Sequence, residues 1–595
     1  MKFPYGISDF FQLIDDGYFY VDRTDRIPLI EAAGNQLLFL RPRRFGKSLL
    51  LSMLENYYDI AKATEFDQLF RQLAIGKNPT PLHNQYFVLR WDFSLISASG
   101  TAEQIQRSLH AHINSRLVAF AQKYQQWLPG ALLISQENAV VSLEALLTLI
   151  RQTPYKLYLL IDEYDNFANE VLMGGQGANQ KRYETLLSGE GELKLIFKAV
   201  KAASSGLGLE RVFITGVSPI VISDMTSGYN VAENTYLNAV FNDLCGFWET
   251  EVAEVLQRVI TDCGWPAEKM PEALSLVRTF YNGYCFGYKA DGYVYNPTLV
   301  LYFLKYLQRE GEYPPEMLDH NLAMDRSKLA YLTQQPQGRQ LLLDILNETT
   351  PITVEQLASR FGLAEILTAR VDTTFMASLL YYLGILTLGG RDRLGKLILR
   401  IPNLVVRGLY VERIQTLLLP DAADQKLGQR AAETLYTAGD LQPLCTFIEQ
   451  HYFTILDNRD YRWANELTLK TAFLTLLYND RLYLMDSETA LMRTYADLTM
   501  ILRPEARQYP IFDFLFEFKY ITLPELGMTR EALQQLDDAR VKTLPLVQSK
   551  FSEAQAKLQQ YHTSLTKKYG DQLRLRAYAV VALGFERVVW EEGKR

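Results

Sequence analysis

Cysteine is scarce in this sequence, and the few thiols lie far apart. Four cysteines occur among 595 residues, and none belongs to a C-x-x-C pair. A disulfide framework, or a zinc site built on cysteine, needs more thiols or closer spacing, so we expect neither. The six histidines also lack H-x-x-x-H spacing. Such sparing use of cysteine is typical of a reducing compartment, and we expect a cytoplasmic protein.

Long apolar runs and a strong charge of one sign are absent too. No stretch of 18 apolar residues occurs, and the start MKFPYGISDFFQLIDDG does not resemble a signal peptide, so we expect no membrane span and no leader. The net charge of −7 excludes a uniformly basic coat for nucleic acid but leaves local basic surfaces open. A hydrophobic share of 48% indicates a globular chain. The length suggests roughly three to five domains.

The first part of the chain, residues 1–248, alternates apolar strands with long helices. Strands are predicted at the apolar runs 36–40, 84–94, 155–162 and 211–215, and helices from residue 47, over 102–125 and over 192–203. This alternation is typical of a parallel sheet with helices on both faces. We therefore expect an α/β core.

The rest of the chain divides into four predicted parts. These are a helical lid at 249–345, a winged-helix-like module at 346–410, a helical connector at 411–455 and a second α/β domain at 456–595. Within the module, Thr353 is predicted to cap a helix and a second helix follows from Asp372. Two short strands then flank the polar loop 389–395.

Basic residues gather in and beside that loop: Arg391, Arg393, Lys396 and Arg400. In a wing they would contact phosphates of nucleic acid. The same pattern is equally compatible with a solvated charged hairpin of a packing module.

The segment RPRRFGKS, residues 41–48, follows the run 36–40 and opens a helix. This is the context of a P-loop, in which a helix N-terminus presents free N–H groups to phosphate. Lys47 would reach the β- and γ-phosphates of ATP, and the hydroxyl of Ser48 would ligate Mg²⁺. The first glycine of the usual motif is Arg41 here, which makes the loop unusually basic. The residues expected to bind nucleotide are Arg43, Arg44, Phe45, Gly46, Lys47 and Ser48.

A second signal lies at the end of the run 155–162. Asp162 and Glu163 follow buried-strand residues, where an acidic pair would serve nucleotide hydrolysis. We expect Asp162 to hold Mg²⁺ and Glu163 to orient or deprotonate the attacking water. Thr215, at the end of a further strand, would sense the γ-phosphate, or would lie in a turn with a satisfied hydroxyl.

The position of an arginine finger stays open. Arg43, Arg44 and Arg211 all qualify, as does an arginine of a neighbouring subunit. Asp22, in YFYVDRT, would contact nucleotide or hold a turn, and we favour the turn.

The last predicted domain carries acidic residues on apolar strands. Strands are predicted over 494–502 and 511–521, joined by a polar, proline-containing segment. A hairpin would bring Asp497 beside Glu517. Two adjacent carboxylates repel each other, and a divalent cation such as Mg²⁺ resolves that repulsion.

Side-chain alternation places further groups on the same face as Glu517. Asp513 and Lys519 share that face, and the phenylalanines between them share the other. Lys519 would orient the nucleophile or stabilise developing charge near the metal. The alternative for E-x-K on a strand is a solvated edge face.

Seven segments spread over the chain contain or flank these motifs: PYGISDFFQLIDDGYFYVDRT, LFLRPRRFGKSLLLSML, LLIDEYDN, FITGVSPI, YNGYCFG, VYNP and LILRIPN. Together they resemble the bacterial AAA-ATPase-like family that is commonly fused to a PD-(D/E)XK nuclease. The resemblance spans nearly the whole chain, and RPRRFGKS is the form of the P-loop in that family. It implies a RecA/AAA-like ATPase core followed by a restriction-endonuclease-like α/β fold.

The resemblance also implies further site residues. Glu466 matches the helical acid of RecB-like nucleases, which would make Glu466, Asp497 and Glu517 the metal ligands. Where the superfamily has a Q-x-x-x-Y helix, this chain has Gln555, Gln559 and Tyr561, with Lys557 in the glutamine position. The proline that usually precedes the first acid is Ala496.

The function expected from these features is an ATP-regulated, Mg²⁺-dependent nuclease. Its substrate would be nucleic acid, most readily DNA, and Mn²⁺ would also serve in the nuclease site. We expect a homo-oligomer without membrane partners, acting in defence against phage or mobile elements by analogy. The alternatives are a nucleotide-dependent DNA-binding switch with an inactive nuclease domain, and a translocating motor.

Overall fold

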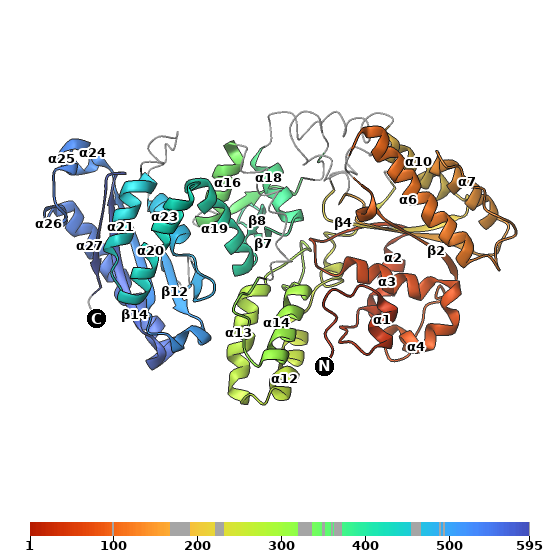
Figure 1. Cartoon of the computed structure of the whole chain (residues 1–595), viewed down its shortest axis with the longest axis horizontal. Coiled ribbons are helices and arrows are strands. Elements are labelled where there is room, and N and C mark those ends of the chain that lie inside the picture. The colour runs from red at the N-terminus through yellow and green to blue at the C-terminus, as the bar shows by residue number, and fades with distance from the viewer. Residues whose placement is uncertain are drawn as a thin grey trace. The chain divides into compact units, whose positions relative to one another are not determined.

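The protein is described from a computed structural model (Figure 1). It describes residues 1–97, 100–166, 191–219, 231–318, 336–347, 351–358, 361, 372–453, 466–486, 490–491 and 494–593. The chain forms two compact units: residues 1–312, 319–337 and 353–403 make the first, and residues 313–318, 338–352 and 404–595 make the second. Each unit is described by itself.

The first unit is built on a five-stranded parallel sheet with the order β2-β3-β4-β1-β5. The strands are β1 (Gln36–Leu40), β2 (Tyr86–Asp92), β3 (Lys156–Asp162), β4 (Leu209–Gly216) and β5 (Glu233–Asn234). The expected parallel α/β sheet is confirmed. Because the strands are parallel, their carboxyl ends meet at one edge, and β4 separates the strand before the P-loop from the strand that ends in Asp162.

Helices cover both faces of this sheet. Figure 1 shows α6 (Ala102–Lys123), α7 (Ala139–Ile150) and α10 (Glu192–Ala203) on one face, and α2 (Ile27–Ala33) and α3 (Lys47–Tyr58) on the other. Shorter helices α1 (Phe10–Asp15), α4 (Phe66–Phe70) and α5 (Ala74–Lys77) lie beside α3. α6 begins with a capping box, in which Thr101 accepts from the N–H of Gln104 and the Gln104 side chain accepts from the N–H of Thr101.

A helical segment follows the sheet, with α12 (Glu249–Asp262), α13 (Met270–Tyr281) and α14 (Pro297–Glu310). All three are amphipathic, and α13 and α14 carry a proline in the first turn, where a missing N–H costs little. A further helix, α16 (Pro336–Asn347), belongs mostly to the second unit.

A small three-stranded sheet, order β6-β8-β7, lies in the region expected to be winged-helix-like. Its strands are β6 (Ile352–Val354), β7 (Thr387–Arg391) and β8 (Leu397–Arg400), and α18 (Thr373–Tyr382) begins after the cap residue Asp372. The predicted hairpin and second helix are present. The helix expected after Thr353 is wrong for 353–358, because Thr353 lies inside β6 and no helix follows through residue 358; the rest of that predicted helix, apart from Phe361, lies outside the described residues.

The second unit contains a mixed five-stranded sheet with the order β15-β14-β13-β12-β9. The strands are β9 (Tyr483–Asp486), β12 (Leu498–Leu502), β13 (Asp513–Ile521), β14 (Leu575–Leu583) and β15 (Arg587–Glu592). β13 and β14 run parallel, and the other neighbours are antiparallel. A short hairpin of β10 (Ala490–Leu491) and β11 (Thr494–Tyr495) precedes β12.

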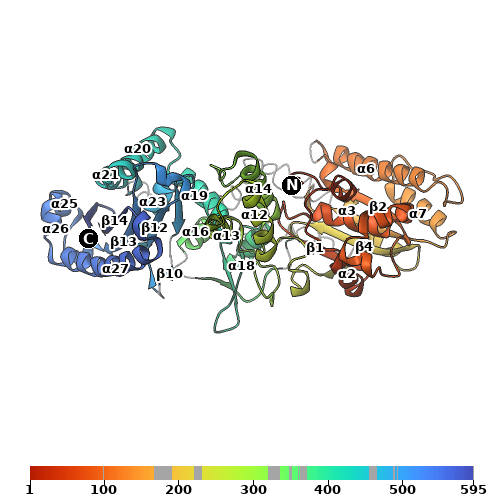
Figure 2. The ribbon, with the colours of Figure 1, turned by 90° about the horizontal axis from the view of Figure 1, so that it is seen from below.

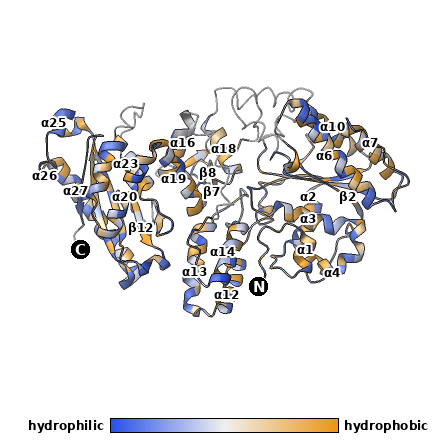
Figure 3. Ribbon diagram, viewed as in Figure 1, coloured by the Kyte–Doolittle hydropathy of each residue, from blue (hydrophilic) through white to orange (hydrophobic). Residues whose placement is uncertain are grey.

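Helices cover both faces of this second sheet as well. Figure 2 shows α27 (Pro545–Tyr569) on one side and α20 (Ala422–Ala438), α21 (Gln442–Phe447) and α23 (Glu466–Leu477) on the other. Phe473 of α23 packs at a tilt against Phe516 and Phe518, at 5.7 and 4.9 Å between ring centroids. β12 is buried and coloured hydrophobic (Figure 3), as expected for a strand covered on both faces.

α19 (Leu404–Leu418) is largely buried and packs against α23. The remaining helices of this unit are short: α24 (Leu523–Leu526), α25 (Arg530–Gln534) and α26 (Asp538–Lys542). The predicted start of the last domain at residue 456 lies outside the described residues. Within the described part of the chain, we find no helix with the length and apolarity that crossing a bilayer requires.

Candidate functional sites

The loop between β1 and α3 has the backbone of a phosphate-binding turn. Gly46 precedes α3 with φ +93°, a left-handed conformation that suits glycine. Arg44 is also left-handed, with φ +68°, which is costly for a residue with a Cβ. The hydroxyl of Thr298 donates to the Arg44 carbonyl at 2.7 Å and helps to hold this strained turn.

Arg41 is buried and does not face the loop's open side. Its guanidinium donates to the carbonyls of Leu40, Tyr236 and Phe241 at 2.8, 3.0 and 2.5 Å. It lies over the rings of Phe39 and Phe286, and burial lowers its pKa to about 10. This arginine therefore anchors the loop through buried carbonyls, and its charge does not lie on the loop's surface.

Phe45 anchors the loop in the same way. Its side chain is buried in edge-to-face contacts with Tyr284 and Phe286, at 4.9 and 5.2 Å between centroids. Both partners belong to the segment YNGYCFG, which the sequence singled out without a role. The side chain of Phe45 is thus structural, and its contribution to nucleotide binding would come from the main chain.

Lys47 is almost fully buried and rests on main-chain oxygens. Its Nζ donates to the carbonyls of Arg41 and Pro42, at 3.0 Å each. Burial lowers the pKa of Lys47, while Glu163 and Asp162 act in the opposite direction. Its partners in the loop are neutral, so its ammonium is available to an incoming phosphate.

Asp162 and Thr215 meet at the carboxyl edge of the sheet. The Thr215 hydroxyl donates to Asp162 Oδ1 at 2.7 Å, and Arg90 Nη2 donates to Asp162 Oδ2 at 3.1 Å. The same Arg90 nitrogen lies 3.5 Å from the carbonyl of Ser48. Arg90, on β2, is a site residue that sequence reasoning missed, because a strand arginine between apolar residues carries no motif.

Glu163 has an unusual backbone next to Asp162. Its φ is +48°, a left-handed conformation that bulky residues rarely adopt. Such strain persists where the surrounding structure enforces it and is common at functional sites. Burial raises the pKa of Glu163, Asp162 raises it further, and Lys47 opposes both effects.

The segments DEYDN and TGVSP, at the ends of β3 and β4, are bonded to each other. Asp165 accepts from the N–H groups of Val217 and Ser218 at 3.0 and 2.8 Å, and from the Ser218 hydroxyl at 2.9 Å. Gly216 permits this contact, because a Cβ there would lie 2.4 Å from the Tyr164 ring. The hydroxyl and the N–H of Ser218 are therefore both bonded to Asp165.

The arginines considered as fingers lie in different places. Arg43 lines the cavity described below and donates to Asn166 Oδ1 at 2.7 Å. Arg211 lies near the start of β4, opposite Tyr158, so about 13 Å of strand separates it from Thr215. Arg211 is therefore excluded as a finger within its own subunit. Asp22 accepts from the N–H and hydroxyl of Thr24, which is the turn role we favoured.

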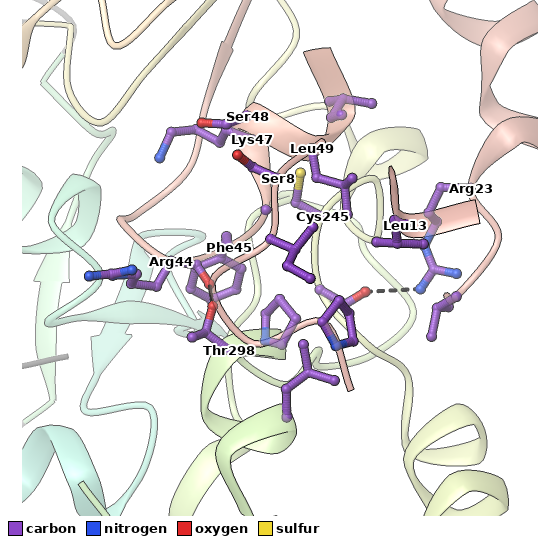
Figure 4. A pocket seen from close by; sticks show the side chains of 18 of the residues that line it. Ser8, Leu13, Arg23, Arg44, Phe45, Lys47, Ser48, Leu49, Cys245 and Thr298 are labelled. Atoms are coloured by element: carbon purple, nitrogen blue, oxygen red, sulfur yellow. Dashed lines mark hydrogen bonds between the residues drawn. The ribbon is translucent and has the colours of Figure 1, made fainter. Parts of the chain in front are cut away.

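A cavity of about 530 Å³ opens beside the loop (Figure 4). Its walls are residues 4–8, 19–21, Arg23, 43–50, Glu163, 244–247, Pro297, Thr298 and Leu301, with a few neighbours. Figure 4 shows Arg44, Phe45 and Lys47 along one wall and Leu13 and Arg23 along another. The volume is within the range of small-molecule sites. Sequence reasoning missed the N-terminal wall, since PYGIS carries no charge pattern.

In the second unit, Asp497 lies one residue before β12, next to the first residue pair of β12 and β13, Leu498 with Phe516. Glu517 follows Phe516 on β13, so both acids lie at the same end of this pairing. Asp497 Oδ2 accepts from the N–H of Phe518 at 2.8 Å, which fixes this carboxylate against β13.

Glu517 is fully buried and paired with two lysines. Its Oε1 accepts from Lys519 Nζ at 3.0 Å and from Lys557 Nζ at 2.5 Å. Its Oε2 is buried without a hydrogen-bond partner among the described residues. Burial raises the pKa of Glu517 and so does Asp497, while the two lysines lower it.

Other predicted residues of this region are placed as follows. Glu466 lies 3.7 Å from Lys519 Nζ, and burial raises its pKa with a further contribution from Asp497. Asp513 is held at the far end of β13 by Arg507 and takes no part in the site. Gln555 donates to the carbonyl of Glu592, so its amide does not face Glu517.

The carboxylates fit Mg²⁺ only in part. Among the described residues there is no group of three or more His, Cys, Asp or Glu side chains arranged to hold a metal ion. Mg²⁺, however, commonly uses one or two carboxylates together with water and substrate phosphate. Asp497 and the unpartnered Oε2 of Glu517 supply such a pair.

The hairpin of β7 and β8 uses most of its basic residues internally. Arg391 donates to the carbonyl of Gly395 at 2.5 Å, Lys396 pairs with Glu355 at 2.9 Å, and Arg400 lies 4.5 Å from the Tyr293 ring. These contacts favour a packing role over phosphate contact.

Comparisons with known proteins extend the picture. An uncharacterized protein in the vnfD 5′ region of Azotobacter chroococcum mcd 1 is 26% identical over 559 residues, covering 90% of this chain and 92% of that protein. The Aeropyrum pernix Orc1 protein, solved in complex with DNA, matches over 69% of this chain and 98% of its own, at 12% identity and a TM-score of 0.24. A TM-score that low establishes no shared fold. Residues 4–226, which hold the P-loop, Asp162 and Thr215, match the family model of predicted AAA-ATPases.

Proposed function

We propose that the first unit binds and hydrolyses ATP with Mg²⁺. The observation that carries this half of the proposal is the cavity of about 530 Å³ with residues 43–50 and Glu163 in its wall. The base and ribose would occupy the cavity, and the phosphates would lie over the N-terminus of α3. The family match over residues 4–226 supports the same reaction class.

The roles of the residues follow from their positions. Lys47 would exchange its two carbonyl partners for phosphate oxygens, and Ser48 and Asp162 would hold Mg²⁺, which neutralises charge on the phosphates. Glu163, strained and with a raised pKa, would accept a proton from the attacking water.

We further propose that the second unit cleaves phosphodiester bonds in nucleic acid, with DNA as the favoured substrate. The observation that carries this half is the buried Glu517 at the same end of the β12–β13 pairing as Asp497, with one carboxylate oxygen unpartnered among the described residues. A divalent ion held by these two carboxylates would activate water and polarise the phosphate. Lys519, anchored by the Phe518 carbonyl at 2.6 Å, would orient the nucleophile, and Glu466 would complete the acidic side.

One observation favours a second candidate function. Because two ammonium groups occupy Glu517 Oε1, the site as described has a metal ligand already neutralised. If both ammonium groups stayed on Glu517, no metal would bind there. The protein would then act as a nucleotide-dependent switch that binds nucleic acid without cleaving it. The two candidates make opposite predictions for cleavage.

The test is a cleavage assay with purified full-length protein and Mg²⁺ on supercoiled plasmid, linear duplex, single-stranded DNA and RNA. Cleavage is expected for the wild type, and Glu517→Gln should reduce it about 100-fold or more, since an amide cannot replace the carboxylate ligand. Glu553→Gln, on the exposed face of α27, is the matched control and should cleave as the wild type does. If the wild type cleaves none of these substrates, the binding switch replaces the nuclease.

A further inference from the structure

Lys557 is the least expected member of the carboxylate site. It lies on α27, four residues before the buried Tyr561, where a strict Q-x-x-x-Y helix would carry glutamine. Its Nζ lies 2.5 Å from Glu517 Oε1, closer than the 3.0 Å of Lys519. The carboxylate therefore meets one ammonium from its own strand and another from the helix that covers the sheet.

The two lysines differ in how firmly they are held. Lys519 is 7% exposed and also donates to the Phe518 carbonyl. The Lys557 side chain is 48% exposed, and its only described hydrogen bond is the one to Glu517. Burial lowers the pKa of Lys557, whereas Glu517, Asp497 and Tyr561 all raise it. Lys557 is thus the cation that can leave.

Exchange of this cation has an electrostatic consequence. A divalent ion that binds Glu517 must approach a carboxylate next to two positive charges, and like charges repel strongly in a partly buried site. A backbone phosphate near the mouth of the site would attract the exposed ammonium of Lys557. Moving Lys557 from Glu517 to that phosphate would leave only the repulsion from Lys519.

We propose that Lys557 is an internal counter-ion of Glu517 that makes metal binding depend on nucleic acid. Before nucleic acid binds, its ammonium on Oε1 repels a divalent ion that approaches Oε2 of Glu517. When nucleic acid binds, Lys557 pairs with a phosphate, and the metal binds Glu517 against the charge of Lys519 alone. Lys557 is therefore a positioning residue, and this inference rests on the proposed nuclease site.

The experiment measures Mn²⁺ affinity by electron paramagnetic resonance in full-length protein, with and without a phosphorothioate DNA duplex that resists cleavage. In the wild type, the duplex should tighten Mn²⁺ binding at the Glu517 site about tenfold. Lys557→Gln should bind Mn²⁺ about tenfold more tightly without DNA, and DNA should add little. Lys557→Arg keeps the charge and should behave as the wild type does.

Lys550→Gln is the matched control, because Lys550 lies two turns earlier on α27 and pairs with Glu553 at the surface. It should leave both affinities unchanged. Glu517→Gln distinguishes a failure of the counter-ion role from a failure of the metal site. If Glu517→Gln weakens Mn²⁺ binding but Lys557→Gln changes nothing, the metal site stands and the counter-ion role is overturned. If Glu517→Gln changes nothing either, the metal site is overturned together with it.

Discussion

The nucleotide site and the carboxylate site both combine lysine with acidic residues, but they pair their charges differently. In the first unit, Lys47 rests on two neutral carbonyls, and Asp162 is held by the Thr215 hydroxyl and Arg90. In the second unit, Lys519 and Lys557 both rest on the acid Glu517. The cation of the first site is available to a ligand, whereas the acid of the second is already neutralised.

This difference in charge pairing indicates which of the two sites can bind its ligand without first releasing a charged partner. Burial lowers the pKa of Lys47, and an added phosphate would stabilise its charged form. At Glu517, Oε2 has no hydrogen-bond partner among the described residues, but the two ammonium groups on Oε1 repel a divalent ion. We therefore expect ATP binding to need no preceding exchange of charges, and metal binding at Glu517 to become tighter once one ammonium leaves.

The largest expected effect is at Lys47. Lys47→Ala should lower the rate of ATP hydrolysis about 100- to 1000-fold, because the transition state loses a positioned cation. Phosphate release at saturating ATP is the measurement. Lys156→Ala, exposed at the opposite end of β3, is the control and should hydrolyse ATP normally. Equal rates of ATP hydrolysis for Lys47→Ala and the wild type would contradict the role of this loop in nucleotide binding.

The next effect separates two neighbouring arginines of the loop. Arg41→Gly restores the usual glycine, yet it should lower the free energy of unfolding by about 3 kcal/mol, because three buried carbonyls lose their donor. Arg44→Gly should change it by less than about 1 kcal/mol, since glycine adopts φ +68° without strain. Urea unfolding of both variants is the measurement. Equal stability of Arg41→Gly and the wild type would contradict the anchoring role.

A smaller effect is expected at the contact between β3 and β4. Gly216→Ala would place a Cβ 2.4 Å from the Tyr164 ring and 2.6 Å from Asp165 Oδ1. Overpacking of this kind costs about 1–3 kcal/mol. Thermal unfolding should therefore show a lower Tm, and ATP hydrolysis should fall because Thr215 is displaced. Gly130→Ala, where the added Cβ would meet only Leu149 at 3.7 Å, tests glycine loss in the same unit without the clash.

The smallest effect concerns Arg90, the counterpart of Lys557 in the first site. Arg90→Gln removes one cation from Asp162 but leaves Thr215 in place. The Mg²⁺ concentration that half-saturates ATP hydrolysis should fall by at most about fivefold, since a partly exposed ion pair contributes little. Arg151→Gln, on the surface, is the control. If Arg90→Gln changes metal affinity in the first unit more than Lys557→Gln does in the second, the expected order of the two effects is wrong.

The sequence predicted the framework better than the contacts. Alternating apolar runs located β1–β4 and α10 because burial dictates those patterns. The helix expected at Thr353 failed because a short polar-flanked segment pairs with β8 instead, and sheet pairing is non-local. Asp497 and Glu517 both lie at the end of the β12–β13 pairing, and their role as metal ligands stays a prediction.

The residues that the sequence did not reveal, Arg90 and Asp165, act on partners more than 50 positions away in sequence, so no local pattern marks them. The burial of Arg41 was not foreseen either, because its guanidinium is satisfied by carbonyls about 200 positions away. Lys557 was marked by its place in a helical motif, but its contact with Glu517 was not.

The most direct test of the central claim measures plasmid cleavage at fixed Mg²⁺, with and without ATP, in the wild type and in Lys47→Ala. The account predicts that ATP changes the wild-type cleavage rate and leaves the rate of Lys47→Ala unchanged. An ATP effect of equal size in both proteins would contradict control of the nuclease through the P-loop, as would no effect in either.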